Sequence, residues 1–453
     1  MHSLDTMTLP PTSLPRDARR LLTVAALLLA GLGAALPTPI LAAEPAQLQL
    51  EKTVLLMRHG ARSPNQTPEQ LAPSATRPWP QWPVGTGELT ERGISLLGSL
   101  GGYYRRHYAA AGLLPVEGCP EAGTVAAWAD NVVRRVPLSA QALLEGMFPG
   151  CGLQTGFAPQ AQGADPLFNP VEVGACKISE PKARAAILKA AQGDLDRAAR
   201  SEREGLKAMQ AILQVRGRGN CVVGMPSCGI EDFGNVLDSS KGGVSLEGGL
   251  KAATTVGENF LLEYIQGFPE KDVAWGEAAT PETLTPLLGP RNLYLRLTRQ
   301  PPYIAARNGS PLARALLAAL EDNGSSEAPS SSPPRATRFA AFVGRDTHLA
   351  TIAALLGLQW RLADQPDQFP MGGSLAFERL LDPATGKRYV RTVLYYQSLQ
   401  QMRSNAALDA EHQPGRVVLT MPGCEKGQRD GACPLATVKA RFEASLADDC
   451  PGG

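Results

Sequence analysis

Residues 54–64 read V-L-L-M-R-H-G-A-R-S-P, an apolar run that leads directly into Arg58, His59 and Arg62. The run 52–57 is short, apolar and rich in β-branched residues at its start, which predicts a buried parallel strand. Two arginines beside one histidine repel each other unless a negative group lies between them. We therefore expect the end of this strand to bind an anion.

A second strand, polar turn and helix occur far along the chain. Residues 338–343 (R-F-A-A-F-V) predict a strand, residues 344–348 (G-R-D-T-H) a turn, and residues 349–358 an apolar helix. Ligands of open α/β sheets bind beyond the carboxyl ends of the strands. The sequence therefore predicts an α/β fold in which both turns contribute to one site.

Between the two turns, apolar residues recur mostly at the spacing typical of helices. We predict a large α/β domain with a central, mostly parallel sheet, made of residues 44–178 and 286–453. A smaller helical domain, residues 179–285, is expected to be inserted as a cap.

Residues 1–43 have the pattern of a cleaved secretory signal peptide. Three arginines precede the apolar run 21–36, and the small pair Ala42–Ala43 closes the segment. The run is shorter than the roughly 20 apolar residues that a membrane-spanning helix needs. We expect a periplasmic or secreted protein without a stable membrane anchor.

Charge gives no reason to expect a nucleic acid partner. Cleavage after Ala43 removes three basic and two acidic residues, so the net charge falls from +1 to 0. A chain without a basic field does not attract polyanions over its whole surface. An anion must be held locally.

All eight cysteines follow the predicted cleavage point. An even number in an exported chain predicts four disulfides. A zinc site is the alternative, but the sequence has no C-x-x-C pair and few histidines. The close pairs Cys221/Cys228 and Cys424/Cys433 indicate local bridges, and spacing leaves the other pairings open.

The first turn has the residues needed for phosphoryl transfer. Arg58 and Arg62 offer planar forks of N–H donors suited to a tetrahedral oxyanion. His59 is the neutral-pH nucleophile between them, and its attack on phosphorus would give a covalent phosphohistidine. Asp346 in the second turn is a candidate proton donor to the leaving oxygen. A structural ion-pair cluster around a buried histidine explains R-H-G equally well.

Further motifs decide between these interpretations, because together they resemble the histidine acid phosphatase family. The resemblance is to the bacterial periplasmic phytase and glucose-1-phosphatase group in particular. The family's opening motif R-H-G-x-R-x-P is matched in full at residues 58–64. Other matching stretches are W-P-x-W-P-V (79–84), L-T-E-R-G (89–93), F-P-G-C (148–151), D-P-L-F-N-P (165–170), G-G-S-L-A-F-E-R (372–379) and Y-Y-Q-S-L-Q-Q-M-R (395–403).

The resemblance implies an exported acid phosphomonoesterase with the histidine-phosphatase fold, no metal and no cofactor. Its substrate would be a small phosphorylated molecule, and the protein a monomer or small homo-oligomer. His59 corresponds to the phosphorylated nucleophile and Asp346 to the proton donor. The phosphate-binding residues it implies are Arg58, Arg62, Arg134 and Arg345. The disulfides it implies are Cys119–Cys151, Cys176–Cys450, Cys221–Cys228 and Cys424–Cys433.

The chain departs from the family at its second motif, which is His-Asp in the family and Arg345-Asp346 here. An arginine keeps a donor for phosphate, but its permanent charge is expected to lower the pKa of Asp346 and shift activity toward acid. The alternative is a phosphoester-binding protein with weak or lost turnover. His348 replaces the family's asparagine, and we expect it either to contact the substrate or help Asp346, or to be a solvent-facing histidine at a helix start.

The substrate is left open by the sequence. Asn65 and Gln66 stand where phytases carry a basic residue, whereas Gly60 stands where glucose-1-phosphatases have asparagine. Phytate, glucose-1-phosphate and other sugar or organic phosphates all remain candidates. A mutase of the wider superfamily is disfavoured by the export signal.

Overall fold

The computed structural model describes residues 47–217, 225, 227–239, 243–321 and 337–450. The predicted signal peptide and Cys221 lie outside these residues. The chain from Ala46 onward forms one compact unit, and its division into an α/β domain and a helical domain stays a prediction. None of the helices described here is long and apolar enough to cross a lipid bilayer.

An eight-stranded mixed sheet forms the centre of the fold, in the order β10-β8-β7-β1-β6-β2-β3 with β9 paired to β8. One half is parallel and contains β1 (Gln49–Arg58), β6 (Phe339–Gly344), β2 (Val125–Ala129) and β3 (Gly156–Phe157). The other half is antiparallel and contains β7 (Ser374–Leu381), β8 (Arg388–Tyr396), β9 (Gly415–Leu419) and β10 (Cys433–Pro434). The predicted α/β class is confirmed.

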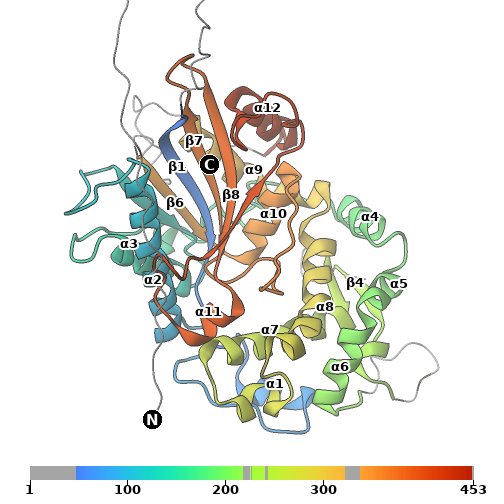
Figure 1. Ribbon diagram of the computed structural model, residues 1–453. Coiled ribbons are helices and arrows are strands. Elements are labelled where there is room, and N and C mark those ends of the chain that lie inside the picture. Colours follow the sequence, from blue (N-terminus) through green and yellow to red (C-terminus); the bar gives the residue numbers. More distant parts are fainter. Residues whose placement is uncertain (1–46, 218–224, 226, 240–242, 322–336, 451–453) are drawn as a thin grey trace, which may run out of the picture. The chain divides into compact units, whose positions relative to one another are not determined.

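Helices cover both faces of the sheet (Figure 1). One face carries α2 (Glu91–Ala110) and α3 (Arg135–Met147), and the other carries α9 (Pro302–Glu321), α10 (Asp346–Leu356) and α12 (Leu435–Ser445). Along β1, Val54 and Leu56 pack with the second set, whereas Leu55 and Met57 pack with the first. Because both faces are buried, residues 54–57 of β1 are apolar at every position rather than at alternate ones.

The parallel register places three strand ends at the same edge. Arg58 lies opposite Gly344, and Ala129 lies opposite Val343, so β1, β6 and β2 end side by side. The residues that follow these strands therefore meet, as predicted for the two turns.

The middle of the chain is helical, as predicted, except for the ribbon of β4 (Asn235–Asp238) and β5 (Ser245–Gly248). Figure 1 shows two of its helices, α7 (Gly249–Gln266) and α8 (Pro281–Arg299). Their side chains Glu258 and Arg291 form ion pairs with Arg58 and Asp346 at the carboxyl ends of the strands. The remaining helices of four or more residues are α1 (Pro68–Leu71), α4 (Glu180–Ala190), α5 (Leu195–Ala199), α6 (Arg203–Leu213) and α11 (Leu399–Ser404).

The start of α2 is fixed against the first turn. The Oγ1 of Thr90 accepts a hydrogen bond from the Gly93 amide at 3.0 Å, which caps the helix. A Cβ atom at Gly93 would lie 2.1 Å from the Ala61 carbonyl oxygen. Only glycine allows this approach, so the loop after His59 is held by the helix.

Three of the predicted disulfides are present in the described residues: Cys119–Cys151, Cys176–Cys450 and Cys424–Cys433. Cys228 is also disulfide-bonded. Its predicted partner, Cys221, lies outside the described residues.

A buried acid on α7 makes stability depend on pH. Glu263 is 1% exposed and accepts one hydrogen bond, from the Ala274 amide at 2.8 Å. Burial raises the pKa of this carboxyl from 4.5 to about 8. Between these values the folded protein keeps a proton that the unfolded chain releases, so the free energy of unfolding falls as pH rises, by up to about 1.4 kcal/mol per pH unit.

We expect Glu263→Gln to remove this pH dependence, because glutamine keeps the acceptor and has no proton to lose. Thermal melts from about pH 5 to 8 should show a smaller decline in Tm for the variant than for the wild type. Glu270→Gln, at an exposed position, is the control and should decline like the wild type. Identical declines in the wild type and Glu263→Gln would contradict the assignment.

Candidate active site

His59 follows β1 and is 3% exposed. Its amide donates to the Gly344 carbonyl oxygen at 2.9 Å, which ties the two strand ends together. The ring Nδ1 lies 2.9 Å from the Gly60 carbonyl oxygen. A carbonyl oxygen only accepts, so we place the ring proton on Nδ1 and leave a lone pair on Nε2. Nε2 accepts from the Nε of Arg135 at 3.2 Å.

The imidazole stays neutral in acid. Burial is the main cause that lowers the pKa of His59 well below 6.5, and the positive charges of Arg135, Arg58 and Arg62 lower it further. A ring that resists protonation keeps its Nε2 lone pair at low pH. The arrangement therefore suits a nucleophile that works in acid.

A carboxylate from α7 lies between the first two arginines. Arg58 Nη2 lies 2.7 Å from one oxygen of Glu258, and Arg62 Nη2 lies 2.7 Å from the other. Burial alone would raise the pKa of Glu258, but Arg62, Arg291 and Arg58 lower it to about 2. The negative group expected between the arginines is thus supplied by the chain itself when no ligand is bound.

The third arginine is Arg135, not the predicted Arg134. Arg134 is exposed at the cap position of α3, whereas Arg135 faces His59 and also donates to the Gly87 carbonyl oxygen at 3.1 Å. Successive residues of a helix project about 100° apart, so only one of the pair can face the site. The rotation of α3, which decides between the two arginines, cannot be read from sequence alone.

Asp346 begins α10 and faces the same cluster. One carboxylate oxygen accepts from the Thr347 amide at 2.8 Å, and the other contacts Arg291 Nη2 and lies 3.8 Å from Arg58 Nη2. Burial would raise the pKa of Asp346, but Arg58 and Arg291 hold it far below its ordinary value. The candidate proton donor is therefore a carboxylate until the medium is acidic.

Arg345 points away from Asp346, which corrects the expected cause of the acid shift. Its Nε lies 3.0 Å from Asp130 Oδ2, and its Nη2 contacts the side-chain oxygen of Asn169. The side chain is 28% exposed, so it remains available at the edge of the site. The low pKa of Asp346 comes from Arg58 and Arg291 instead.

His348 is buried rather than solvent-facing, and it also lines a cavity beside the second turn. It is 6% exposed; Nδ1 accepts from the Arg345 amide at 3.0 Å and Nε2 lies 3.0 Å from the Phe168 carbonyl oxygen. Burial, followed by the charge of Arg345, lowers its pKa to about 4. Both ring nitrogens are used, so His348 fixes the turn that carries Asp346.

The sequence missed several charged residues of the cluster: Asp130, Arg135, Glu258, Arg291 and Asp367. Glu258 and Arg291 lie among largely buried residues of α7 and α8. A charged residue in such a stretch of sequence was the signal that could have pointed to a functional role. No group of three or more His, Cys, Asp or Glu residues suited to a metal occurs in the part of the chain that the structure describes.

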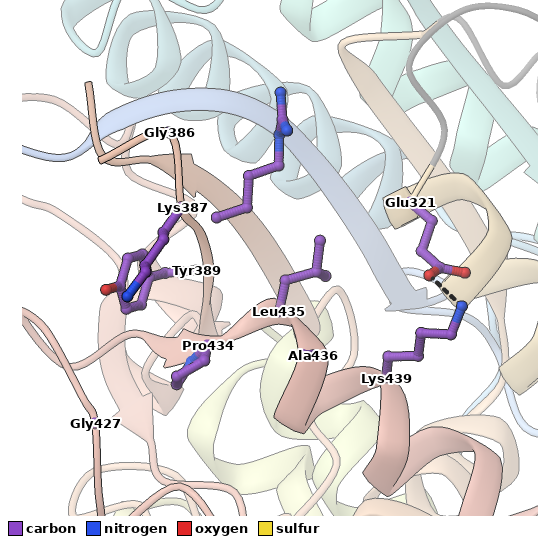
Figure 2. A pocket seen from close by; sticks show the side chains of 10 residues that line it. Glu321, Gly386, Lys387, Tyr389, Gly427, Pro434, Leu435, Ala436 and Lys439 are labelled. Atoms are coloured by element: carbon purple, nitrogen blue, oxygen red, sulfur yellow. Dashed lines mark ion pairs between the residues drawn. The ribbon is translucent and has the colours of Figure 1, made fainter. Parts of the chain in front are cut away.

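A separate hollow lies at the opposite end of the sheet. It has a volume of about 670 Å³ and is formed around the start of β8 and α12, near Lys387, Tyr389 and Lys439 (Figure 2). The end of β7, next to this hollow, pairs with the beginning of β1, whereas His59 follows the end of β1. Lys439 there is paired with Glu321 at 2.8 Å. None of the candidate catalytic residues lines this hollow.

Comparison with known proteins agrees with this geometry. Residues 49–216 and 273–395 match the family model "Histidine phosphatase superfamily (branch 2)". The chain is 32% identical to phytase AppA of Escherichia coli (strain K12) over 88% of this chain and 93% of that protein. It is 30% identical to a glucose-1-phosphatase of Salmonella typhimurium over 86% of this chain and 91% of that protein.

Solved structures give the same result. The Hafnia alvei phytase in complex with tartrate superposes with a TM-score of 0.82 at 35% identity, covering 90% of this chain and all of that one. The protein belongs to the histidine phosphatase superfamily, branch 2. It is a histidine acid phosphatase, a hydrolase of phosphate esters, similar to phytases and glucose-1-phosphatases.

Replacing each of the two neighbouring arginines with alanine tests which of them faces His59. Arg135→Ala removes a charged donor next to His59 Nε2, so we expect kcat/KM for p-nitrophenyl phosphate to fall by roughly 100-fold. Arg134→Ala, the matched control, removes an exposed arginine and should stay near the wild type. A larger loss in Arg134→Ala than in Arg135→Ala would restore the original prediction.

Proposed function

We propose that this protein is an exported acid phosphomonoesterase that forms a covalent phosphohistidine on His59, with Asp346 as proton donor. The observation that carries the proposal is the unprotonated Nε2 of a buried histidine surrounded by guanidinium groups. Phosphoryl transfer depends mainly on positioning and on neutralising charge spread over the phosphoryl oxygens. Arg58, Arg62 and Arg135 supply both.

Substrate must first take the place of a carboxylate. Glu258 now accepts from Arg58 and Arg62, and the phosphoryl oxygens need the same donors. In the proposed complex the phosphoryl group lies between these arginines and Glu258 moves aside. Arg345, at the edge of the cluster, is placed to donate a further hydrogen bond to the group.

The first chemical step forms the N–P bond and breaks the ester P–O bond. Nε2 of His59 attacks phosphorus, and the leaving alcohol oxygen takes the proton of Asp346, which becomes a carboxylate. In the second step Asp346 takes a proton from water as the water oxygen attacks phosphorus. The N–P bond breaks, and the products are the alcohol and inorganic phosphate.

The organic part of the substrate has space beside the second turn. A cavity of about 480 Å³ is lined there by Arg345 and Thr347, which flank Asp346, and by Arg299 and Asn308. The Nε of Arg299 is buried and has no hydrogen-bond partner among the described residues. We propose that substrates with polar or negative substituents, such as sugar or inositol phosphates, extend into this cavity.

Export is inferred from the disulfides rather than from the active site. Disulfides persist in oxidising compartments, and the cysteine bridges of the described residues fit a periplasmic or secreted protein. The cleaved signal peptide and an assembly no larger than a small homo-oligomer stay predictions.

Trapping of the intermediate tests the mechanism. We expect acid-labile, base-stable label on the wild type after brief reaction with ³²P-labelled substrate at acid pH, because a phosphoramidate resists base. His59→Ala should carry no label, whereas His412→Ala, at an exposed position, should label like the wild type.

Turnover separates the enzyme from the alternative, a phosphoester-binding protein of the same fold. Steady hydrolysis of p-nitrophenyl phosphate by the wild type at any pH, lost in His59→Ala, supports the phosphatase. Phosphate binding without turnover or label from low to neutral pH would favour the binder.

A further inference from the structure

A buried arginine from α8 contacts the candidate proton donor. Arg291 is 1% exposed, and its Nη2 contacts Asp346 Oδ2 and lies 3.4 Å from Glu258 Oε1. Its Nη1 donates to Asp367 Oδ1 at 2.8 Å. The proposed chemistry assigns no role to this residue, although it contacts a reacting group.

Asp367 holds Arg291 in this orientation. It is fully buried, and its second oxygen, Oδ2, accepts from Arg58 Nη1 at 2.7 Å. One carboxylate thus fixes two guanidinium groups side by side, one of which faces the phosphoryl site while the other faces Asp346. Arg291 is therefore held as firmly as the phosphate-binding arginine.

We propose that Arg291 is a positioning residue for Asp346: it orients the carboxylate toward the phosphoryl site and defers its protonation until the medium is acidic. This inference rests on the proposed function, in which Asp346 protonates the leaving oxygen. It makes Arg291 a determinant of the alkaline limit of activity.

The other charged and titratable groups that face Asp346 do not replace this effect. Arg58 and His59 approach Asp346 from the end of β1, and Glu258 approaches from α7. Asp367 lies in the loop between α10 and β7. Arg345 and His348 flank Asp346 in its own turn. Two of these groups are carboxylates and disfavour charge on Asp346. Arg345 is directed to Asp130, and His59 and His348 stay neutral.

Among the described residues, Arg58 and Arg291 are the charged side chains that hold Asp346 ionised by contact, and the Thr347 amide adds a hydrogen bond. Arg58 is a proposed phosphate ligand, so its removal would also damage binding. Arg291 can be altered without removing a proposed phosphate ligand, which makes the inference testable by itself.

Arrival of substrate should ease protonation. A phosphoryl dianion near Arg58 adds negative charge beside Asp346, and by linkage a proton on Asp346 then favours substrate binding by the same factor. Arg291 remains between Asp346 and Asp367 during this change. It can thus keep the protonated carboxyl aimed at the leaving oxygen.

The experiment compares wild type with Arg291→Gln by two readouts. The first is the titration of the Asp346 carboxyl, followed by ¹³C NMR of protein labelled at aspartate carboxyls and assigned with Asp346→Asn. We expect its midpoint to rise by about one pH unit or more in Arg291→Gln. The second is the alkaline limb of kcat/KM for an alkyl phosphate, which should move upward with it.

Matched variants separate the local effect from a general one. Arg291→Lys keeps a charge and should shift both readouts less. Arg307→Gln removes an arginine that forms an ion pair with the exposed Asp449, and should shift neither the Asp346 titration nor the alkaline limb of kcat/KM. If Arg291→Gln does not fold because Asp367 keeps only Arg58 as a partner, the double variant Arg291→Gln with Asp367→Asn removes the excess negative charge and should give the same upward shift.

An unchanged Asp346 titration in a folded Arg291→Gln protein would overturn the inference, even if activity falls. A wild type that forms no phosphohistidine would instead overturn the proposed function. The NMR titration needs no turnover, so it decides the role of Arg291 in either case.

Discussion

Buried guanidinium groups repel one another unless negative charge lies between them, and this constraint organises the site. Arg58, Arg62 and Arg291 are each at most 3% exposed. Glu258 and Asp367 lie between them. The pairs need close geometry to offset the cost of burying charge. The sheet edge where β1, β6 and β2 end brings the groups together, and α7, α8 and the 365–369 loop complete the cluster.

Arg58 acts on two titrating groups in compatible ways. Burial, together with the charges of Arg135, Arg58 and Arg62, lowers the pKa of His59, so the imidazole keeps its lone pair in acid. Arg58 and Arg291 lower the pKa of Asp346, so acid is needed to load its proton. A nucleophile that stays neutral and a donor that is protonated only at low pH coexist in one pH range. This combination provides a physical reason for chemistry that runs best in acid.

The sequence predicted the sheet edge because strand and turn patterns are local. The runs before His59 and before Arg345 became β1 and β6. It could not predict which side chain of Arg134 and Arg135 faces His59, since that depends on the rotation of α3. Nor could it pair Arg291 with Asp346, because the two lie on different helices and meet only through packing. Arg345 was expected beside Asp346 by adjacency, but buried Asp130 attracts it away.

A crystal structure with vanadate bound at acid pH tests the central claim most directly, because vanadate takes the geometry of a transferring phosphoryl group. The account predicts a bond or close contact between vanadium and Nε2 of His59, with the oxygens bound by Arg58 and Arg62. Glu258 should have moved from between these arginines. An ion bound elsewhere, with Glu258 still held by both arginines, would contradict it.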